Sequence, residues 1–251
     1  DFDSDFLGVE KGRWVLADND IVPIVQSKQI SAGIVYKKLN WFVNLEVFSK
    51  QVEGITSRNQ GFQNQFQFVQ EQGNYNANGL EFVLNKKTKS FSTWLSYLLM
   101  KNDYTFENLN PSRFPSNFDI RHTATLASTY KHKSLKLAIS VNWRSGKPYT
   151  TPLISDETIN INGNELIQYN NPNNERLSGY FRTNLSAEYV WNFSEKVKGK
   201  FNIAVLNLLN TKNILNRRYA IDRDESNQLR LNQVDEISLG LTPNFSFQLR
   251  F

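Results

Sequence analysis

Apolar and polar residues alternate one by one along most of the chain. In the stretch 179–193 (GYFRTNLSAEYVWNF), the odd positions from Phe181 to Phe193 are mainly apolar or aromatic, and the even positions between them are mainly polar. The stretch 134–147 repeats this pattern, with one face made of Leu135, Leu137, Ile139, Val141 and Trp143. A period of two places successive side chains on opposite faces of a β-strand. We therefore expect long strands that each carry one apolar face.

The same alternation predicts about nine strands and no convincing amphipathic helix, so the expected fold is all-β. The expected strands are 28–38, 41–50, 78–87, 91–104, 118–130, 134–147, 179–193, 198–209 and 240–251. Several are longer than the roughly five or six residues that are usual for strands of soluble proteins.

The links between these strands alternate between short and long. The short links lie near Lys38–Asn40, Lys87–Ser90, Lys131–Ser134 and Ser194–Val197, and the long links are 51–74, 105–117, 148–177 and 210–238. Tight turns at one end and extended loops at the other are typical of an antiparallel up-and-down transmembrane β-barrel, whose tight turns face the periplasm. The last strand would then run from the long-loop side to the periplasmic side.

Aromatic residues near the ends of the expected strands favour the same fold. They are Trp41, Phe91, Tyr130, Trp143, Trp191 and Phe193. Transmembrane barrels carry aromatic girdles at both membrane interfaces. The alternative is that these residues form the core of a large soluble β-sandwich, such as a carbohydrate-binding domain, although sandwich strands are usually shorter.

The composition of the chain excludes several classes of structure and function. The chain has 251 residues with a net charge of +5, and its mean hydropathy is −0.50. It contains no run of 18 apolar residues, which excludes a transmembrane helix, whereas a barrel strand needs only about 9–11 alternating residues. The lysines and arginines are dispersed rather than gathered in a dense stripe, so we do not expect nucleic-acid binding. There is no cysteine, which rules out disulfides and thiolate metal sites.

The number of expected strands indicates a larger protein. Bacterial barrels have an even number of strands, and an open sheet would leave two unpaired edges. The chain also opens on D-F-D-S-D-F without the features of a signal peptide. We therefore expect residues 1–251 to be the C-terminal part of a single β-barrel domain whose earlier strands lie upstream.

Several segments resemble the C-terminal barrel of TonB-dependent outer-membrane receptors, most closely the Bacteroidota type. They occur in the expected order over nearly the whole chain: N-Y-N-A-N-G-L-E-F-V-L (74–84), L-S-Y-L-L (95–99), N-F-D-I-R-H-T-A-T-L-A-S-T-Y (117–130), V-N-W-R-S-G-K-P-Y-T (141–150), R-L-S-G-Y-F-R-T-N-L-S (176–186), F-N-I-A-V-L-N-L-L-N-T-K-N (201–213) and the terminal F-S-F-Q-L-R-F.

This resemblance implies a 22-stranded barrel with an N-terminal plug domain, located in the outer membrane. Such receptors import scarce nutrients, including siderophores, glycans and peptides, and a TonB-type protein supplies the energy through an N-terminal box. The plug, the box and about thirteen strands would lie outside this chain. The alternative function is that of a receptor-like barrel that serves as a structural or assembly subunit of a larger outer-membrane complex without transport.

The sequence shows no catalytic constellation. His122 and His132 have no acidic or histidine partner at ligand spacing, so we expect neither an enzyme, nor a metal centre, nor a cofactor. The acidic clusters at residues 1–5, 18–20, 156–157 and 222–225 are expected to be solvated loop charges, with loop-bound calcium as the alternative.

Ligand contacts are expected from the long loops and from inward-facing polar side chains near them. The candidates are Tyr104, Arg113, Arg144, Lys147, Tyr149, Arg217, Arg218, Tyr219 and Arg223. The alternative is that these side chains contact the plug, lipopolysaccharide or a partner such as a surface lipoprotein.

The terminal segment alternates perfectly. Phe245, Phe247, Leu249 and Phe251 would face lipid, and Ser246, Gln248 and Arg250 would face the lumen. A C-terminal aromatic of this kind also resembles the signal that the barrel-assembly machinery reads. We therefore expect Phe251 at the periplasmic interface, and the four apolar residues to act as an assembly signal.

Overall fold

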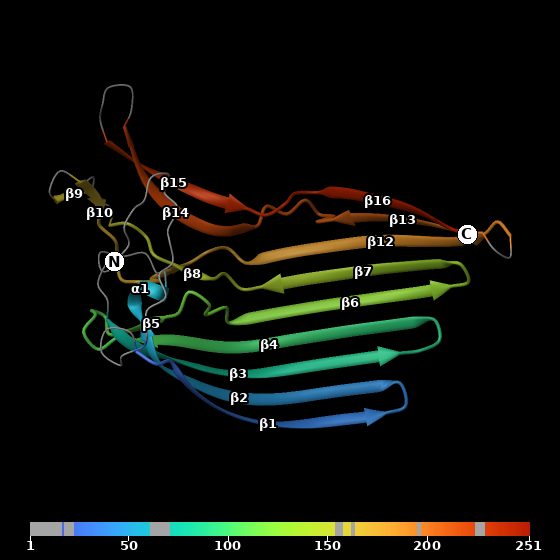
Figure 1. The fold of residues 1–251 in the computed structure, drawn as a ribbon, viewed down its shortest axis with the longest axis horizontal. Coiled ribbons are helices and arrows are strands. Elements are labelled where there is room, and N and C mark those ends of the chain that lie inside the picture. Colours follow the sequence, from blue (N-terminus) through green and yellow to red (C-terminus); the bar gives the residue numbers. More distant parts are fainter. Residues whose placement is uncertain are drawn as a thin grey trace.

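A single antiparallel sheet dominates the structure, a computed structural model that describes residue 17 and residues 23–60, 71–153, 158–161, 164–194, 197–223 and 229–251 (Figure 1). Its long strands are β1 (Gln26–Lys38), β2 (Trp41–Thr56), β3 (Gln72–Lys87), β4 (Phe91–Thr105), β6 (His122–His132), β7 (Leu135–Arg144), β12 (Tyr180–Asn192), β13 (Lys198–Leu206) and β16 (Thr242–Arg250). Within the described ranges, no helix is long and apolar enough to cross a membrane.

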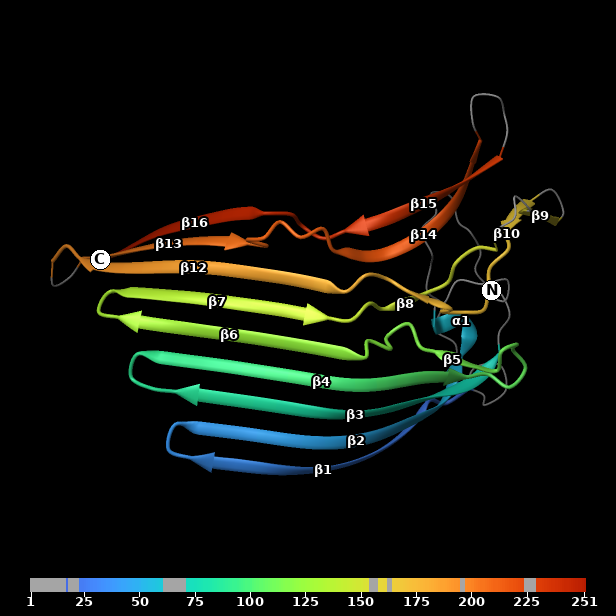
Figure 2. The same cartoon turned by 180° about the vertical axis from the view of Figure 1, so that it is seen from behind.

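The long strands are hydrogen-bonded in the order β1-β2-β3-β4-β6-β7-β12-β13-β16, which is also their order along the chain. Every neighbouring pair is antiparallel. Tight turns join the strands at one end, where the C-terminus also lies, and the longer connections gather at the other end (Figures 1 and 2). The prediction of an all-β, antiparallel, up-and-down sheet is confirmed, as is the direction of the last strand.

Shorter elements occupy the loop end of the sheet. They are α1 (Ser57–Gln60), β5 (Arg113–Pro115), β8 (Pro148–Tyr149), β9 (Thr158–Ile161), β10 (Asn164–Ile167), β11 (Glu175–Arg176), β14 (Ile214–Arg223) and β15 (Leu229–Ile237). β5 pairs with β4, β8 with β11, β9 with β10, and β14 with β15. The expected loops 105–117, 148–177 and 210–238 therefore contain short strands of their own.

The strands around the first long loop are longer than the alternation predicted. β2 continues to Thr56 and β3 already begins at Gln72, whereas we expected a link over 51–74. The register shifts between Glu53 and Ile55, and Gly54 lies at the shift with a φ of 78°. A bulge of this kind interrupts the period of two, which is why the pattern did not reveal the end of β2.

One face of the sheet, which we call the outward face, is apolar across all nine long strands. In-register residues show this: Ile34, Leu45, Phe82, Tyr97, Ala124, Trp143 and Phe181 follow one another from β1 to β12. Phe247 on β16 belongs to the same face, where its ring centroid lies 5.8 Å from that of Trp191. None of the residues in this row is buried, and Ile34 and Phe247 are the most open, with 74% and 57% of their surface accessible. Such a face fits hydrocarbon rather than water.

Polar groups on the outward face pair with each other. The Thr93 and Ser128 hydroxyls lie 2.9 Å apart across β4 and β6. The Tyr97 hydroxyl and His122 Nδ1 lie 2.7 Å apart on the same two strands. Because a polar group in a hydrocarbon environment is costly without a partner, these pairs suit a face that contacts lipid.

The register also shows the strand stagger that a barrel requires. One row of in-register residues runs through Lys38, Trp41, Lys86, Thr93, Ser128, Ile139, Leu185 and Val205. It begins at the short turn after β1 and ends near the loop end of β13. Closing a sheet into a barrel demands strands that are tilted and staggered in this way.

The buried hydrophobic cluster lies at the loop end rather than within the sheet. It consists of Val52, Ile55, Tyr104, Phe106, Leu109 and Phe114, with Tyr75 packed against it. Phe106 and Phe114 stack with ring centroids 6.0 Å apart. The segment 105–117 therefore folds back over the ends of β2, β3 and β4 and fixes the loops next to them.

Two buried asparagines link β13 to the hairpin formed by β14 and β15. Asn207, with a φ of 51°, donates to the carbonyls of Thr211 and Leu239 at 3.0 and 3.1 Å and accepts the Thr211 N–H. The Asn213 side chain pairs with the backbone N–H and C=O of Phe181 at 2.8 and 3.0 Å. These bonds replace the interrupted ladder, so the hairpin extends from the loop end of the sheet (Figure 1).

Removing the Asn207 side chain should destabilise the last hairpin. Asn207→Ala removes the side chain that bonds the backbone groups of Thr211 and Leu239, at a cost of about 0.5–1.5 kcal/mol for each hydrogen bond, and strains the left-handed backbone. Asn207→Gly keeps that backbone favourable and isolates the hydrogen bonds. We expect both variants of the full-length protein in detergent to unfold at lower urea concentrations. Asn192→Ala, an exposed site at the other end of β12, is the control, and equal midpoints for all three variants would contradict the assignment.

Candidate functional site

A hollow of about 410 Å³ opens at the loop end of the sheet, and we call it the loop-end hollow. It is lined by Asn117, Phe118, Ile120, Arg144, Lys147, Pro148, Tyr149, Thr150, Asn173, Leu215, Asn216 and Arg217. Four of the nine predicted ligand-binding residues are among them: Arg144, Lys147, Tyr149 and Arg217. Residues from β7, β8 and β14 thus converge on one place, although they are far apart in the sequence.

The segment R-S-G-K-P-Y (144–149), which begins at the last residue of β7, contains three of these residues: Arg144, Lys147 and Tyr149. The Ser145 backbone N–H donates to the His122 carbonyl at 2.9 Å, and the Ser145 hydroxyl accepts the His122 N–H at 3.1 Å. A Cβ on Gly146 would lie 1.6 Å from the Leu177 carbonyl oxygen, so only glycine fits there. The Leu177 N–H then donates to the Lys147 carbonyl at 3.0 Å. The turn is therefore fixed against both β6 and the segment before β12.

A fully buried carboxylate, Asp119, fastens this turn to the neighbouring loops. It accepts the Asn102 backbone N–H and the Arg121 Nε, each at 2.7 Å, and it pairs with Arg176. The Arg176 guanidinium also donates to the Gly146 carbonyl at 3.2 Å. A buried carboxylate needs such charged and hydrogen-bonded partners. β4, the 116–121 segment, β11 and the turn at Gly146 are thereby held together.

Asn173 joins the third long loop to the second. Its side-chain amide donates to the Pro115 carbonyl and to the Asn117 Oδ1, both at 2.8 Å, and its backbone N–H donates to the Thr150 hydroxyl at 3.0 Å. Asn173 is buried and has a φ of 56°, a conformation that asparagine tolerates better than most residues. One wall of the loop-end hollow is therefore preformed.

Arg217, on β14 of the last hairpin, lines the hollow on the side of that hairpin. Its guanidinium binds the Asp235 carboxylate in a two-pronged ion pair, with Nε and Nη2 at 2.7 and 2.9 Å from the two oxygens. Nη1 donates to the Tyr149 hydroxyl at 3.2 Å, and the guanidinium lies 5.2 Å from the centre of the Tyr149 ring. The hydrogen bond from Arg217 lowers the pKa of Asp235, and Asp235 in turn raises the pKa of Arg217.

Lys147, unlike Arg217, forms no ion pair with the described residues of the chain. Burial lowers the pKa of its ammonium, the neighbouring Arg144 lowers it further, and Glu236 opposes the shift. Burial also raises the pKa of the Tyr219 hydroxyl, with a contribution from Tyr149. Tyr219 itself does not line the hollow, which combines the cations Arg144 and Lys147 with the hydroxyl of Tyr149, an arrangement suited to an anionic or strongly polar ligand.

A second hollow, of about 490 Å³, continues along β6, β7 and β12. Arg144 and Leu215 line both hollows. Here the Arg144 guanidinium lies 4.8 Å from the centre of the Tyr180 ring, and Arg182 Nε donates to Asn184 Oδ1 at 2.8 Å. Arg144 therefore stands at the junction between the loops and the polar, inward face of the sheet.

The other predicted residues lie outside the loop-end hollow. Tyr104 is buried in the hydrophobic cluster, where its hydroxyl donates to Gln60 Oε1 at 3.0 Å. Arg113 on β5 pairs with Asp103 at 2.8 Å. Tyr219 lies two residues after Arg217 on β14, whereas Arg218 alternates to the other side of the strand and Arg223 ends it. Their role in ligand binding stays a prediction.

Sequence reasoning missed the residues that support the hollow, above all Asp119, Asn173, Arg176 and Asp235. Aspartate and asparagine in loops read as solvated turn residues, and only their partners reveal their function. Of the four acidic clusters, only Asp222 falls within the described residues. Among those residues, no three His, Asp or Glu side chains come together as metal ligands.

A sequence profile of the family described as "TonB dependent receptor-like, beta-barrel" matches residues 24–208. The chain belongs to this family. The match covers the sheet from β1 to β13 and includes the turn that carries Arg144, Lys147 and Tyr149. The resemblance read from the sequence is thereby confirmed at the level of the family. No curated protein sequence matches the chain.

Solved structures share the fold. The ferripyoverdine receptor of the outer membrane of Pseudomonas aeruginosa is 13% identical with a TM-score of 0.58, covering 96% of this chain and 29% of the receptor. The ferric citrate transporter FecA is 12% identical with a TM-score of 0.61 (89% and 31% covered), and the outer membrane transporter YddB from Escherichia coli is 11% identical with a TM-score of 0.56 (94% and 34%). At these identities the likeness shows the fold alone, and the chain spans about a third of their length.

The Arg217–Asp235 pair should make the hairpin sensitive to acid. Because the folded pKa of Asp235 is lowered, its contribution is complete above the ordinary carboxyl pKa of about 3.9 and is lost as the pH falls through the folded value. A partly exposed pair contributes about 0.2–1 kcal/mol. We therefore expect hydrogen exchange in β14 and β15, corrected for the intrinsic rate, to accelerate by up to about fivefold below pH 4.

Asp235→Asn is the matched variant, since an amide keeps the shape of the side chain without the titration. In this variant, the amide hydrogens of β14 and β15 should exchange faster than those of the wild type at pH 6, and their exchange should not accelerate further in acid. Protection in β6 and β7 serves as the internal reference. An unchanged acid response in Asp235→Asn would show that another group controls the hairpin.

Proposed function

We propose that the chain is the C-terminal part of the barrel of an outer-membrane TonB-dependent receptor that imports a scarce nutrient. Family membership and the apolar outward face support the location in the outer membrane. The loop-end hollow is the single observation that carries the import function. It lies at the end of the sheet that faces the cell exterior in this type of barrel, and its cationic and phenolic groups suit a ligand that arrives from outside.

The rest of the receptor is expected upstream of the described sheet. β1 and β16 each pair on one side only in the part of the chain that the structure describes. An open sheet with an apolar face leaves these edges without hydrogen-bond partners in the membrane, so further strands must complete the ladder. We place residues 1–251 in a single barrel domain, with a plug and a box for the TonB-type energy-coupling protein elsewhere in the full-length protein.

The substrate class follows from the hollow. Arg144 and Lys147 provide positive charge that no described carboxylate neutralises as closely as Asp235 neutralises Arg217. Such a site binds an anionic nutrient complex. The names of the structural neighbours supply two suitable probes, ferripyoverdine and ferric citrate.

Cells that produce the full-length protein should take up at least one limiting nutrient, tested with these two iron complexes and with glycans and peptides. Uptake should require both the receptor and the TonB-type protein. The double variant Arg144→Gln/Lys147→Gln should lower the apparent affinity by tenfold or more, because a hydrogen bond to a charged group contributes about 1.5–3 kcal/mol. Lys212→Gln, an exposed cation at the loop end that does not line the hollow, is the matched control.

Two outcomes would contradict the proposal. Normal uptake without the TonB-type protein would indicate a passive pore. Deletion of the receptor without effect on any uptake, together with a stoichiometric partner in the purified complex, would favour a structural or assembly subunit such as one that holds a surface lipoprotein.

We also propose that Phe245, Phe247, Leu249 and Phe251 act as an assembly signal. Phe245 and Phe247 are paired in register with Ile203 and Phe201, and Phe251, with 92% of its surface exposed, lies at the short-turn end (Figure 1). An exposed aromatic row on an edge strand is accessible to the barrel-assembly machinery before the barrel closes.

Phe251→Ser should therefore reduce the amount of folded protein in the outer membrane severalfold, measured as the fraction that resists unfolding by SDS without heating. Phe251→Tyr, which keeps the aromatic ring, should assemble normally. The signal is excluded if Phe251→Ser assembles as well as Phe251→Tyr.

A further inference from the structure

Lysines gather at the short-turn end of the sheet without acidic neighbours. Lys37 and Lys38 are the last residues of β1, Lys86 and Lys87 are the last residues of β3, and Lys89 lies in the turn between β3 and β4. The stretches 36–43 and 84–93 contain no aspartate or glutamate. Glu46 and Glu81, the next carboxylates along β2 and β3, lie five residues from Trp41 and Lys86, a distance of about 16 Å along a strand.

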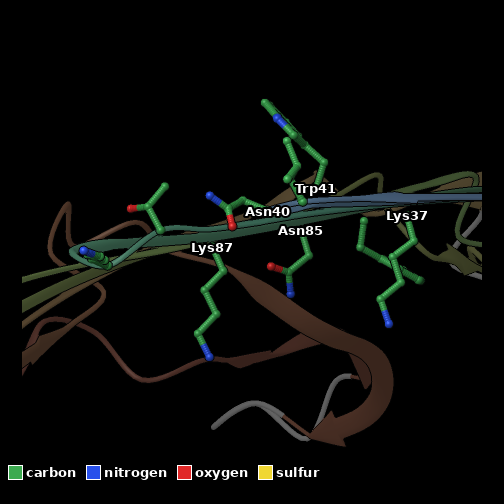
Figure 3. Close-up of a pocket in the computed structure, with 9 residues that line it drawn as sticks. Lys37, Asn40, Trp41, Asn85 and Lys87 are labelled. Atoms are coloured by element: carbon green, nitrogen blue, oxygen red, sulfur yellow. The ribbon is translucent and has the colours of Figure 1, made fainter.

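The five lysines fall on both faces of the sheet. A hollow of about 580 Å³ lies at these two turns, and Lys37, Lys87 and Lys89 are among the residues that line it. Figure 3 shows Lys37, Asn85 and Lys87 on one side of the sheet and Trp41 on the other. Lys38 and Lys86 are in register with Trp41 on either side of it, so both belong to the outward face.

Lys38, Trp41 and Lys86 thus form a row across three neighbouring strands. The Lys86 ammonium lies 4.2 Å from the centre of the Trp41 ring. The next outward row toward the middle of the sheet is Tyr36, Val43 and Leu84, which is apolar. The row therefore marks the boundary between the part of the face that suits hydrocarbon and the polar turns, and tryptophan and lysine are favoured at such a boundary.

We propose that Lys38, Trp41 and Lys86 bind the phosphate headgroup of an anionic phospholipid in the leaflet that contacts the short turns. This rests on the proposed function, because only a barrel in a membrane presents the outward face to lipid. Lys38 and Lys86 flank Trp41 in register at the boundary of the apolar surface, the level at which a headgroup phosphate is expected. Lys37, Lys87 and Lys89 add positive potential within about a Debye length of 8–10 Å.

The distribution of charged residues between the two ends of the sheet favours a lipid phosphate as the ligand of this row. At the loop end, arginines such as Arg113, Arg121 and Arg217 pair with carboxylates of the same chain. The lysines at the two short turns have no carboxylate in the stretches 36–43 and 84–93, and the nearest ones along the strands, Glu46 and Glu81, lie about 16 Å away, so a negative group from outside the chain can approach them. Because the row borders an apolar, outward surface, the group that reaches it is part of a lipid rather than of a soluble anion.

The test uses the purified full-length receptor, titrated with phosphatidylglycerol in detergent and read by native mass spectrometry. Phosphatidylcholine and inorganic phosphate are parallel arms. Wild type should bind phosphatidylglycerol in preference to phosphatidylcholine. Lys38→Gln/Lys86→Gln should weaken this binding about thirtyfold, since each basic group near an anionic surface contributes about fivefold. Lys38→Arg/Lys86→Arg, which keeps the charges, should retain the binding.

Lys28→Gln/Lys101→Gln is the matched control, because Lys28 and Lys101 lie on the same outward face at the loop end. It should bind phosphatidylglycerol within twofold of wild type. The proposal is overturned if Lys38→Gln/Lys86→Gln binds like wild type, if the control is weakened equally, or if inorganic phosphate displaces the lipid at equal concentration. The lipid assay involves no uptake, so loss of import with intact lipid binding would overturn only the proposed function.

Discussion

The in-register antiparallel ladder is the constraint on which the rest of this structure depends. Each long strand alternates its side chains, and each register carries that alternation onto the next strand, so one apolar face extends from Ile34 on β1 to Phe247 on β16. A slip of one residue in any pair would move the polar side of a strand into the lipid-facing surface. The bulge at Gly54 lies beyond the outward-facing apolar residues of β2, so its change of phase does not disturb the outward face.

The apolar side chains of the sheet lie on its outward face, so they do not form a core against which the loops could pack. The loop end relies instead on a small aromatic cluster around Phe106 and on buried polar side chains that bind backbone groups. Asp119 ties three segments together, Asn173 joins two loops, and Asn207 replaces an interrupted ladder. Polar side chains with full hydrogen bonding fix loop geometry without a large core. The hollow that contains Lys147 is a product of this arrangement.

The period of two, with the alternation of short and long links, predicted the nine long strands and their direction, because both signals are local. The extra strands β14 and β15 were hidden, since the segment from Asn207 to Asn213 interrupts the alternation and reads as a loop. Arg144, Lys147, Tyr149 and Arg217 were predicted one by one from charge and loop position. Their convergence was not, because it depends on tertiary contacts such as Arg217 with Asp235 and Gly146 with Leu177.

The two ends of the sheet differ in how their cations are paired. This difference determines which kind of anion each end can bind. At the loop end, several guanidinium groups pair with carboxylates of the same chain, as Arg176 does with Asp119, and these pairs fix their positions, whereas Lys147 forms no ion pair with the described residues. At the short turns, Lys86 lies over the Trp41 ring, and no acidic residue occurs in the same turns. Rigid, paired charges favour selection of one ligand, whereas mobile ammonium groups at an apolar boundary favour many equivalent phosphate groups. The proposed ligand site and the proposed lipid site therefore lie at opposite ends of the sheet, an arrangement that suits a barrel held at a fixed depth in a bilayer.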